Sequence, residues 1–289
     1  MAAFVDKINS LTPAIKRIIC YKATEYPFTG QYNKTTSYGT YLCRRCGLAL
    51  FRSDSQFHSN CGWPSFDESI LKTVAQVPDP DGERTEITCS RCAAHLGHVF
   101  TGENFTAKNL RHCVNSAALD LVAGNQVQDT EEAIVAGGCF WGIEHFMRQI
   151  PGVLKVEVGY IGGIKPEPTY EEVCSGLTRH YEAARIVFDN SQTNYHTVIK
   201  RFFEIHDPTQ RNGQGPDIGS QYESAIFYYN LEQLTEIQDL IALLKKRGYQ
   251  VATSLRKAVT FWPAEDYHQA YYSKQGTLPY CHHPADRFG

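Results

Sequence analysis

Methionine is scarce in this sequence: Met1 and Met147 are the two examples among 289 residues. Positive charge is not in excess either, because the sequence has 28 lysines and arginines against 31 acidic residues, and its formal net charge is −3. Proteins that bind nucleic acids usually carry a concentrated basic surface, so this composition argues against that class. A low methionine content suits a protein that works among oxidants, since methionine is readily oxidised to its sulfoxide.

Long apolar runs are also missing. No stretch of the sequence approaches the roughly 20 apolar residues that a membrane span requires. Residues 1–20 place Asp6, Lys7, Lys16 and Arg17 among their apolar positions, which is unlike a secretory signal. We therefore expect a cytoplasmic protein that does not bind membranes. With 42% hydrophobic residues and a length that allows about two domains, the composition is that of an ordinary globular protein.

Cysteine, by contrast, is abundant, with ten residues. Without a secretory signal, this number indicates thiol chemistry and metal binding rather than a disulfide scaffold. Two Cys-x-x-Cys pairs, Cys43 with Cys46 and Cys89 with Cys92, supply the four thiolates of a typical structural zinc site. The alternatives are two separate redox pairs, packing cysteines, or a zinc ribbon that binds other macromolecules. The doubled spacing favours structural zinc, and we expect no organic cofactor.

The first half of the chain has the pattern of a small β domain. Residues 11–19 predict a short helix with Thr12 as its cap. From Gly39 onward, short apolar segments alternate with Gly, Pro, Asp and Ser. This pattern predicts strands at 41–43, 48–51, 84–88, 98–100 and 111–114. We expect a mostly antiparallel β domain over residues 1–122, stabilised by the zinc ion, and then a polar linker at 123–131.

Two further cysteines and two histidines of this half stand outside the metal-binding pattern. Cys61 lies in a loop broken by Gly and Pro, and Cys113 lies in an alternating segment. Arg111, two residues before Cys113, is a cation that would support a thiolate there. His95 and His98 are spaced for either a metal site or proton handling. Because four sulfurs are already available for zinc, we interpret the histidines as groups of a pocket.

The second half is organised around Cys139. The apolar run 133–136 predicts a buried strand, and the helical spacing of apolar residues from 143 to 150 predicts a helix. Cys139 then lies where a strand turns into a helix, and the N–H groups of that helix end favour a thiolate. The alternative is a buried, small apolar residue. The preceding glycines and the following aromatic residues favour a nucleophile in a pocket.

Strand and helix patterns alternate through the rest of the second half. Strands are predicted at 154–158, 184–188, 223–229 and 251–259, and helices at 195–206 and 234–244. With the first strand and helix, the order is strand, helix, strand, strand, helix, strand. This order predicts a two-layer α+β sandwich with a ferredoxin-like core over residues 132–289.

Four segments of the first half resemble the B-type peptide-methionine sulfoxide reductases. They are 27–30, 61–66, 95–100 and 111–116, in the order of that family, and the resemblance covers roughly residues 8–121. It implies that Cys113 attacks the substrate, that Cys61 is the resolving cysteine and that the four paired cysteines bind zinc. It also implies a substrate pocket formed by Trp63, His95, His98, Arg111 and Asn115.

Segments of the second half resemble the A-type peptide-methionine sulfoxide reductases, an unrelated fold that acts on the opposite sulfoxide epimer. They are 136–144, 159–163, 168–176, 180–183, 206–210, 215–222 and 264–269, and the resemblance covers residues 131–281. It implies that Cys139 is the nucleophile and Glu182 the acid. It also implies that Phe140 and Trp141 hold the methyl group, and that Tyr170, Asp217 and Tyr222 complete the oxygen-binding side.

Together the two resemblances imply a bifunctional repair enzyme that reduces the R epimer in its first domain and the S epimer in its second. Attack by a cysteine on the protonated sulfoxide would leave a sulfenic acid, a second cysteine would form a disulfide, and thioredoxin or a similar dithiol would reduce it. The substrate would be methionine sulfoxide, free or in oxidised proteins. A zinc-ribbon interaction protein would leave the second half unexplained, and a cysteine hydrolase would need an essential histidine base.

The partner of Cys139 has two candidates in its own domain. Cys174 lies in a helical-looking turn, where a packed thiol is the default. Cys281 lies in a tail with two prolines, next to His282 and His283, which would favour its thiolate. A-type reductases often carry the resolving cysteine in such a tail, so we expect Cys281 to resolve Cys139.

Overall fold

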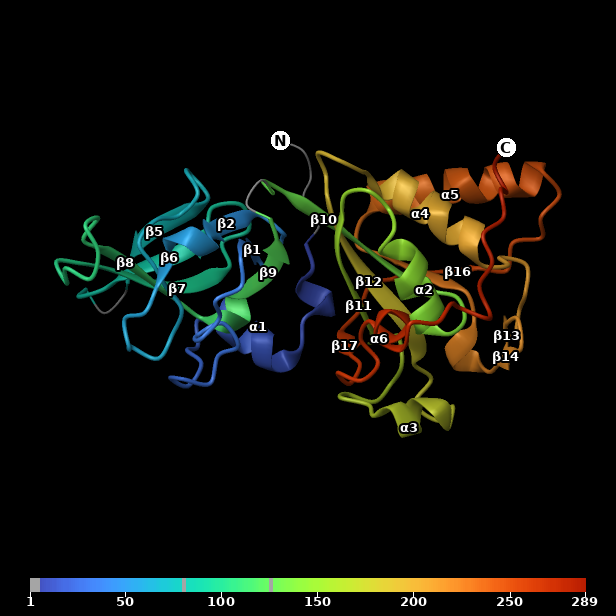
Figure 1. Cartoon of the computed structure of the whole chain (residues 1–289), viewed down its shortest axis with the longest axis horizontal. Helices are drawn as coiled ribbons and strands as arrows, with labels where there is room; N and C mark the ends of the chain where they lie inside the picture. Colours follow the sequence, from blue (N-terminus) through green and yellow to red (C-terminus); the bar gives the residue numbers. More distant parts are fainter. Residues whose placement is uncertain (1–5, 80–81, 125–126) are drawn as a thin grey trace. The chain divides into compact units, whose positions relative to one another are not determined.

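The computed structural model describes residues 6–79, 82–124 and 127–289 (Figure 1). The chain divides into two compact units, Met1–Thr130 and Glu131–Gly289, each with its own buried core. Part of the predicted linker, Asn125 and Gln126, lies outside the described residues. Ala123 ends one strand and Thr130 begins the next, and the limits of the linker at 123–131 stay a prediction.

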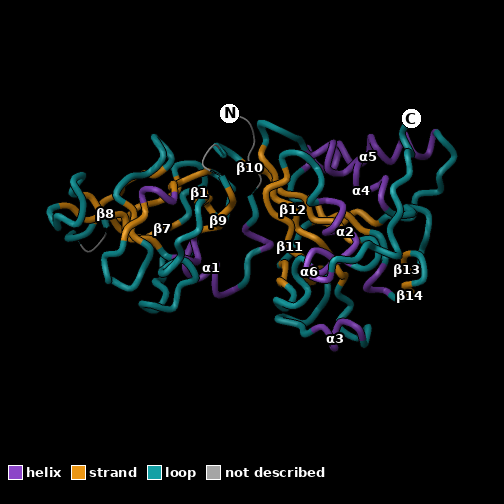
Figure 2. Tube along the Cα trace, viewed as in Figure 1, coloured by secondary structure: helices purple, strands orange, loops and turns teal. Residues whose placement is uncertain are grey.

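The first unit consists mainly of short strands, drawn in orange in Figure 2. Its helical segments are η1 (Ile8–Ser10), α1 (Pro13–Ile19), η2 (Ser53–Ser55) and η3 (Ser116–Ala118). Its strands are β1 (Gly39–Cys43), β2 (Ala49–Arg52), β3 (Gln56–Phe57), β4 (Ser65–Phe66), β5 (Val74–Pro78), β6 (Thr85–Cys89), β7 (His95–Thr101), β8 (Leu110–Val114) and β9 (Leu119–Ala123).

These strands form two antiparallel sheets, in the orders β2-β1-β9 and β3-β4-β8-β7-β6-β5, so the predicted antiparallel β domain is confirmed. An aromatic core holds the unit together, in which Phe51 stacks on Phe66 at 4.4 Å and Tyr41 meets the edge of the same ring. Cys113 on β8 pairs with Ser65 on one side and His98 on the other. The register of the larger sheet therefore surrounds this cysteine with polar neighbours.

The second unit mixes helices and strands. Its helical segments are α2 (Phe140–Met147), α3 (Tyr170–Cys174), α4 (Tyr195–Ile205), η4 (Ser220–Tyr222), α5 (Leu231–Lys246) and α6 (Tyr271–Gln275). Its strands are β10 (Thr130–Ala136), β11 (Val153–Ile161), β12 (Tyr181–Asp189), β13 (Gly213–Gln214), β14 (Asp217–Ile218), β15 (Ala225–Tyr228), β16 (Ser254–Lys257) and β17 (Phe261–Pro263).

Six of these strands form one sheet in the order β16-β15-β10-β12-β11-β17, and α2, α4 and α5 pack on one of its faces. Figure 1 shows α4 and α5 side by side along this layer. The side chains of β10 alternate between the two faces. Ala133 and Val135 join the core under the helices, whereas Ile134 and Ala136 pack with Phe227 against the opposite face.

Most of the predicted elements are present, and their caps follow the sequence. Thr12 accepts a hydrogen bond from the Ile15 N–H at the start of α1, and Asn194 accepts one from the Thr197 N–H at the start of α4 (2.9 Å). The predicted strand 251–259 is wrong in length, because β16 covers four residues of it. None of the helices in the described residues combines the length and the apolar composition that crossing a membrane requires.

Candidate active sites and metal centre

Four cysteines of the first unit form a buried cluster. The Sγ atoms of Cys43 and Cys92 lie 3.6 Å apart, those of Cys46 and Cys89 lie 3.5 Å apart, and all four lie within 4.8 Å of one another. A tetrahedral ion with metal–sulfur bonds of about 2.3 Å would separate its ligands by about 3.8 Å. The cluster therefore has nearly the dimensions that a metal ion with four sulfur ligands requires.

Two similar turns build this cluster. In each turn, the residue after the second cysteine donates its N–H to the carbonyl of the first cysteine, Gly47 to Cys43 (2.8 Å) and Ala93 to Cys89 (2.9 Å). Both residues have positive φ angles, +75° for Gly47 and +56° for Ala93. Left-handed backbone is easy for glycine and strained for alanine, so the second turn carries a strain that the first does not.

Cys61 and Cys113 are in direct contact, with 3.7 Å between their Sγ atoms. The hydrogen bond from Cys113, together with the hydroxyls of Ser59 (3.0 Å) and Ser65 (3.5 Å), lowers the pKa of Cys61 to about 4. The same bond between the thiols, and burial, raise the pKa of Cys113. Arg111 lowers the pKa of Cys113, as the sequence predicts, but less strongly. The contact between the two thiols therefore lowers the pKa of Cys61 and raises that of Cys113.

A hollow of about 120 Å³ lies beside Cys113. This volume suits one amino-acid side chain and is well below the roughly 300–1,000 Å³ of pockets for drug-sized ligands. Its lining consists of Thr24, Trp63, Arg84, Gly97, His98, Phe100, Cys113 and Asn115. Gly97 has no side chain to keep β7 away from the carbonyl of Cys113. Trp63, His98 and Asn115, which the resemblance assigns to substrate binding, thus lie around the reactive sulfur.

One wall of this hollow is held by Glu25, which sequence reasoning missed. Its carbonyl accepts from Trp63 Nε1 (3.1 Å) and its N–H donates to Asn115 Oδ1 (3.1 Å). Its carboxylate accepts from the N–H groups of Ser116 and Ala117 at the start of η3. A glutamate in a loop without periodicity gives no sequence signal of such contacts, because they arise from segments about 90 residues apart.

The remaining two predicted pocket residues are engaged with carboxylates. His95 Nδ1 lies 2.7 Å from Glu86 Oε1, and burial lowers the pKa of His95, so its ring is neutral at neutral pH. Its Nε2 is buried and has no hydrogen-bond partner among the described residues. Arg111 forms a bidentate ion pair with Glu103 (2.6 and 2.8 Å), and its Cζ atom lies 4.4 Å from the centre of the Phe100 ring. His95 and Arg111 therefore lie behind the wall rather than in it.

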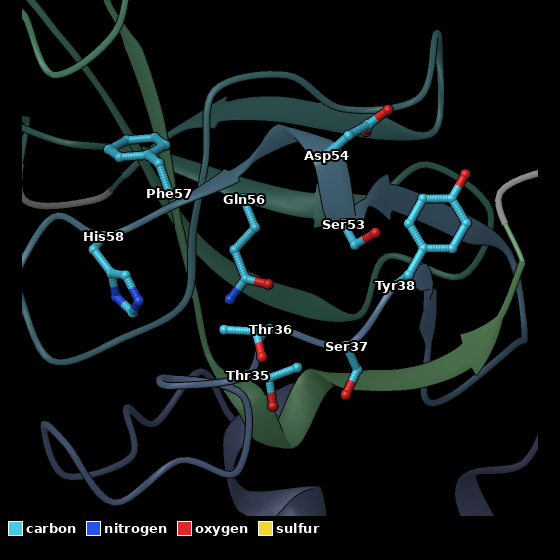
Figure 3. A pocket seen from close by; sticks show the side chains of 9 residues that line it. All are labelled: Thr35, Thr36, Ser37, Tyr38, Ser53, Asp54, Gln56, Phe57 and His58. Carbon is cyan, nitrogen blue, oxygen red and sulfur yellow. The ribbon is translucent and has the colours of Figure 1, made fainter.

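A second hollow of the first unit, about 270 Å³, is shown in Figure 3. Side chains from 35–38, 53–54 and 56–58 line it, and neither Cys61 nor Cys113 does. Gln56 points into it, but both ends of its amide are satisfied, by Tyr41 OH (2.6 Å) and by the carbonyl of Tyr32 (3.0 Å). The polar groups of this hollow thus serve the fold, and we do not assign it to the site.

In the second unit, Cys139 caps the N-terminus of α2, as predicted for a strand-to-helix turn. Gly138 makes the turn with φ of +93°, a conformation that favours glycine. The hydrogen bond with Cys281, followed by burial, raises the pKa of Cys139. The N–H of Trp141 lowers it, as the sequence predicts for a helix start, but this contribution is smaller. Burial and the neighbouring thiol thus oppose the effect of the helix start on Cys139, and the resting thiolate on Cys139 stays a prediction.

Glu182 is the second residue of β12 and is 1% exposed. Its Oε2 accepts a hydrogen bond from the N–H of Phe140 (3.2 Å), the residue after Cys139. Burial, with the charges of Asp217 and Cys281, raises the pKa of Glu182 to about 8. The carboxyl group therefore carries a proton at neutral pH and lies beside the reactive turn.

Cys281 is the thiol that meets Cys139. The hydrogen bond with Cys139 and the imidazole of His282, 3.0 Å from its Sγ, lower the pKa of Cys281 to about 6. The tail that carries it is docked, since the hydroxyl of Tyr280 donates to Asp217 (3.0 Å). Cys174 is exposed on α3, and its thiol interacts with the hydroxyl of Tyr170. The structure thus brings Cys281 to Cys139, in line with the sequence prediction.

An aromatic cluster borders this thiol pair. Phe140 is buried, and Trp141 stacks face to face on Tyr271 with 3.7 Å between ring centres. The indole Nε1 of Trp141 donates to His268 Nδ1 (3.2 Å), and the ring of Tyr170 lies 4.4 Å from the same imidazole. Sequence reasoning assigned Phe140, Trp141 and Tyr170, but missed His268 and Tyr271, which hold the indole in place.

The oxygen-binding residues predicted from the resemblance lie near the acid. Burial raises the pKa of both Tyr170 and Tyr222, and the nearby Glu182 raises them further, so both phenols remain hydroxyl donors at neutral pH. Asp217 is close enough to raise the pKa of Glu182 but is occupied by Tyr280 of the tail. The tail and the acid therefore share one carboxylate neighbour.

The segment 264–269 connects these parts. Glu265 accepts from the hydroxyl of Tyr160 (2.8 Å) and from the N–H of Tyr170 (3.0 Å). The side-chain amide of Gln269 accepts a hydrogen bond from the N–H of Val158 (3.0 Å) and donates one to its carbonyl (2.9 Å). These are the two hydrogen bonds that the backbone of a residue on a neighbouring strand would make. This motif therefore fixes β11 and α3 around the site and leaves the chemistry to the thiols.

Each unit thus holds a pair of neighbouring thiols beside proton-carrying and aromatic groups, the set of groups that a thiol-dependent oxidoreductase requires. Comparison with protein families finds the peptide methionine sulfoxide reductase family over residues 131–288 and the SelR domain over residues 11–123. The first match covers more than half of the chain, so the chain belongs to the peptide methionine sulfoxide reductase family. A reductase domain of the B type precedes one of the A type, and the chain reduces both epimers of methionine sulfoxide.

Individual relatives match the second unit. The peptide methionine sulfoxide reductase MsrA of Acinetobacter baumannii strain AYE is 48% identical over 151 residues, which are 52% of this chain and 87% of that protein. MsrA of Deinococcus radiodurans is 47% identical over 154 residues, 52% of this chain and 75% of that protein. Among solved structures, reduced Mxr1 of Saccharomyces cerevisiae is similar with a TM-score of 0.52 and 29% identity, covering 57% of this chain and 97% of Mxr1.

Proposed function

We propose that each unit reduces one epimer of methionine sulfoxide through a cysteine sulfenic acid and an intramolecular disulfide. The observation that carries this proposal is the contact between Cys61 and Cys113, 3.7 Å apart at Sγ, together with the proximity of Cys281 to Cys139 in the second unit, where each thiol shifts the pKa of the other. A disulfide can form from such a pair without a large movement of the backbone.

In the second unit, the sulfur of Cys139 attacks the S-sulfoxide while Glu182 protonates the sulfoxide oxygen. Methionine leaves, and Cys139 becomes a sulfenic acid. The pKa of Glu182, about 8, supports this role, because an acid must carry its proton at the working pH. Phe140 and Trp141 hold the methyl group, and the hydroxyls of Tyr170 and Tyr222, with Asp217, complete the oxygen side.

In the first unit, Cys113 attacks the R-sulfoxide and Cys61 resolves the sulfenic acid. Trp63 holds the methyl group, His98 and Asn115 form the polar side, and His95 and Arg111 support that side from behind through their contacts with Glu86 and Glu103. The hollow beside Cys113 supports this assignment for Trp63, His98 and Asn115. The lowered pKa of Cys61 suits a resolving role, because the thiolate form is the nucleophile in disulfide formation.

Both disulfides need an external dithiol for the next turnover. Thioredoxin, with a reduction potential of about −270 mV, is a sufficient reductant for redox-active disulfides, and we propose it or a similar dithiol as the partner. The substrate is methionine sulfoxide in oxidised proteins or as the free amino acid, and the site of action is the cytoplasm. No nucleic acid, membrane or organic cofactor enters this scheme.

We assign zinc to the cluster of Cys43, Cys46, Cys89 and Cys92, as a structural ion without an open position. Burial of all four thiols and their spacing support this choice. For the second unit, we infer a ferredoxin-like core, because the strands β10, β11, β12 and β15 lie in the order β15-β10-β12-β11 with helices before β11 and β15. The domain limits 1–122 and 132–289, with the linker between them, stay predictions.

The division of labour by epimer is tested with two single substitutions in the full chain. Cys139→Ser should abolish reduction of the S-sulfoxide and leave that of the R-sulfoxide, and Cys113→Ser should do the reverse, because each removes one nucleophile. Chiral chromatography of the products measures both activities, with Cys174→Ser as a control outside the thiol pairs. Loss of both activities in either variant would contradict two independent sites.

A further inference from the structure

His282 is a buried imidazole that the proposed mechanism does not yet use. It is 1% exposed, and both of its ring nitrogens have a partner. Nδ1 lies 3.0 Å from the Sγ of Cys281, and Nε2 lies 2.8 Å from the carbonyl oxygen of Gly137. The ring therefore connects the resolving thiol to the backbone of the turn that carries Cys139.

These two contacts determine which nitrogen holds the proton of the neutral ring. The carbonyl of Gly137 has no hydrogen to give, so Nε2 must carry the N–H and donate it. Nδ1 then has a free lone pair that faces the Sγ of Cys281. This tautomer can accept the proton of the thiol, as a histidine base does for a cysteine or serine nucleophile.

Two glycines make room for this ring. A Cβ atom on Gly142, in the first turns of α2, would overlap the imidazole, and one on Gly138 would lie 3.2 Å from its Cε1. Glycine inside a helix is unfavourable by roughly 1 kcal/mol relative to alanine, so its use here calls for a local reason. The need to admit the His282 ring to the Cys139 turn supplies that reason.

The chain beyond His282 is tied to α4. The N–H of Ala285 donates to the carbonyl of Glu204 (2.8 Å), and the guanidinium of Arg287 donates to the carbonyls of Phe203 (2.9 Å) and His206 (3.0 Å). With Tyr280 attached to Asp217 on the other side, the tail is anchored before and after the cysteine. The ring is therefore held in its orientation.

Resting on the proposed function, we propose that His282 is the catalytic base of the resolving step. Nδ1 takes the proton from Cys281, and the resulting thiolate attacks the sulfur of the Cys139 sulfenic acid. The S–O bond breaks as the S–S bond forms, and the hydroxide leaves as water with the proton that His282 had accepted. Thiol and sulfenic acid thus give disulfide and one water, and no further reactant is needed.

The first half-reaction explains why a base is needed at this point. In the resting enzyme, the thiol of Cys139 also lowers the pKa of Cys281, but conversion of Cys139 to a sulfenic acid consumes that thiol. The nearby His206 cannot replace it, because its ring is bound to the carbonyl of Phe202 (2.7 Å) and to Ser224 (2.8 Å), and burial lowers its pKa to about 3. His282 is the imidazole in contact with the sulfur.

The test compares three variants of the full chain in single turnover with the S-sulfoxide and no reductant. In His282→Gln, the amide nitrogen can still donate to the carbonyl of Gly137, but the base at the Nδ1 position is lost. Gly142→Ala keeps the imidazole but displaces it from its position against Gly142, because the added Cβ atom would overlap the ring. His283→Gln is the matched control, since His283 is exposed and next in the chain. Methionine release reports the first step, and peptide mapping after rapid quenching reports the Cys139–Cys281 disulfide.

We expect all variants to release one equivalent of methionine at the wild-type rate, which also shows that they are folded. Disulfide formation should slow about 10- to 100-fold at pH 7 in His282→Gln, because a thiol without a base is a few per cent ionised there. Gly142→Ala should slow it as well, and a 1,3-dicarbonyl probe should trap the accumulated sulfenic acid. His283→Gln should match the wild type.

Raising the pH separates a base from a group that merely positions the tail. Above about pH 9 the thiol ionises without help, so the rate in His282→Gln should approach that of the wild type. The other groups that face this pair are the same in all variants: Cys139, Glu182, Asp217, His206 and Arg287. A wild-type rate of disulfide formation in His282→Gln, or a deficit that persists at high pH, would overturn the proposal. Absence of methionine release from the wild type would instead contradict the proposed function.

Discussion

At the scale of single residues, chemistry in the second unit depends on where protons are held. Burial keeps a proton on Glu182, whose pKa is raised to about 8, and the pKa of Cys281 is lowered by its neighbours Cys139 and His282. The proposed acid therefore carries its proton at neutral pH.

The proton on Glu182 makes the S-epimer reaction depend on pH in a defined direction. Because the carboxyl donates a proton, the rate of the first half-reaction should fall as the pH rises through about 8. Glu182→Gln should lower the rate at pH 7 by about 10²- to 10⁴-fold and remove this fall. Single-turnover methionine release across pH 6–10 measures both effects. An unchanged rate in the variant would remove Glu182 from the mechanism.

The same residue links pH to the stability of the second unit. A carboxyl whose pKa is raised on folding favours the folded state while it is protonated, so stability is full below the unfolded value, about 4.3, and falls as the pH rises to about 8. The cost of folding with this group buried is then on the order of a few kcal/mol at pH 9. Glu182→Gln should remove that loss, which denaturant unfolding at pH 6 and pH 9 would detect.

At the scale of elements, the two turns of the cysteine cluster differ in backbone strain. The turn after Cys46 has glycine at its left-handed position, Gly47, whereas the turn after Cys92 has Ala93 there. The two turns make the same backbone hydrogen bond, so the difference lies in the side chain and not in the shape of the turn.

This difference predicts opposite effects of exchanging the two residue types. Ala93→Gly should stabilise the first unit by up to about 1 kcal/mol. The substitution removes the strain of an alanine in the left-handed conformation, and this gain exceeds the extra conformational entropy that a glycine loses on folding. Gly47→Ala should destabilise it, since its Cβ would also meet the backbone of Thr130. Denaturant unfolding of the first unit measures both. Destabilisation by Ala93→Gly would show that the alanine is not strained.

At the scale of the whole molecule, two separate cores carry two separate sites. The core of the first unit surrounds the cysteine cluster, and the core of the second lies between its sheet and α2, α4 and α5. Each thiol pair also comes from one unit. Binding of a structural zinc ion contributes about 10–16 kcal/mol in small domains, as much as the whole stability of a typical domain.

Removal of the metal should therefore unfold one unit and leave the other. We expect a strong chelator to abolish reduction of the R-sulfoxide and to remove one thermal transition. Reduction of the S-sulfoxide should stay within about twofold of its starting value, because the second unit keeps its own core. Metal analysis and calorimetry of the same sample make the comparison. A parallel loss of both activities would contradict the independence of the units.

The sequence by itself determined the local features of this protein and its family. Helix caps such as Thr12 and Asn194, the strand-to-helix turn at Cys139 and the doubled Cys-x-x-Cys spacing depend on residues close together in the chain, so they can be recognised from the pattern. The family motifs likewise identified Glu182, which no periodicity would have selected. These features were predictable because their physical causes are local.

The tertiary structure alone decided how these features meet. His282 and Gly137 are 145 residues apart, and Glu25 and Ser116 are 91 apart, so their contacts depend on how whole elements pack. The same packing lowers the pKa of Cys281 and raises that of Cys139, because burial and a second thiol oppose the effect of the helix start at Cys139. Burial and long-range contacts set the proton positions of both sites, and these quantities exist in the folded chain and not in any short stretch of its sequence.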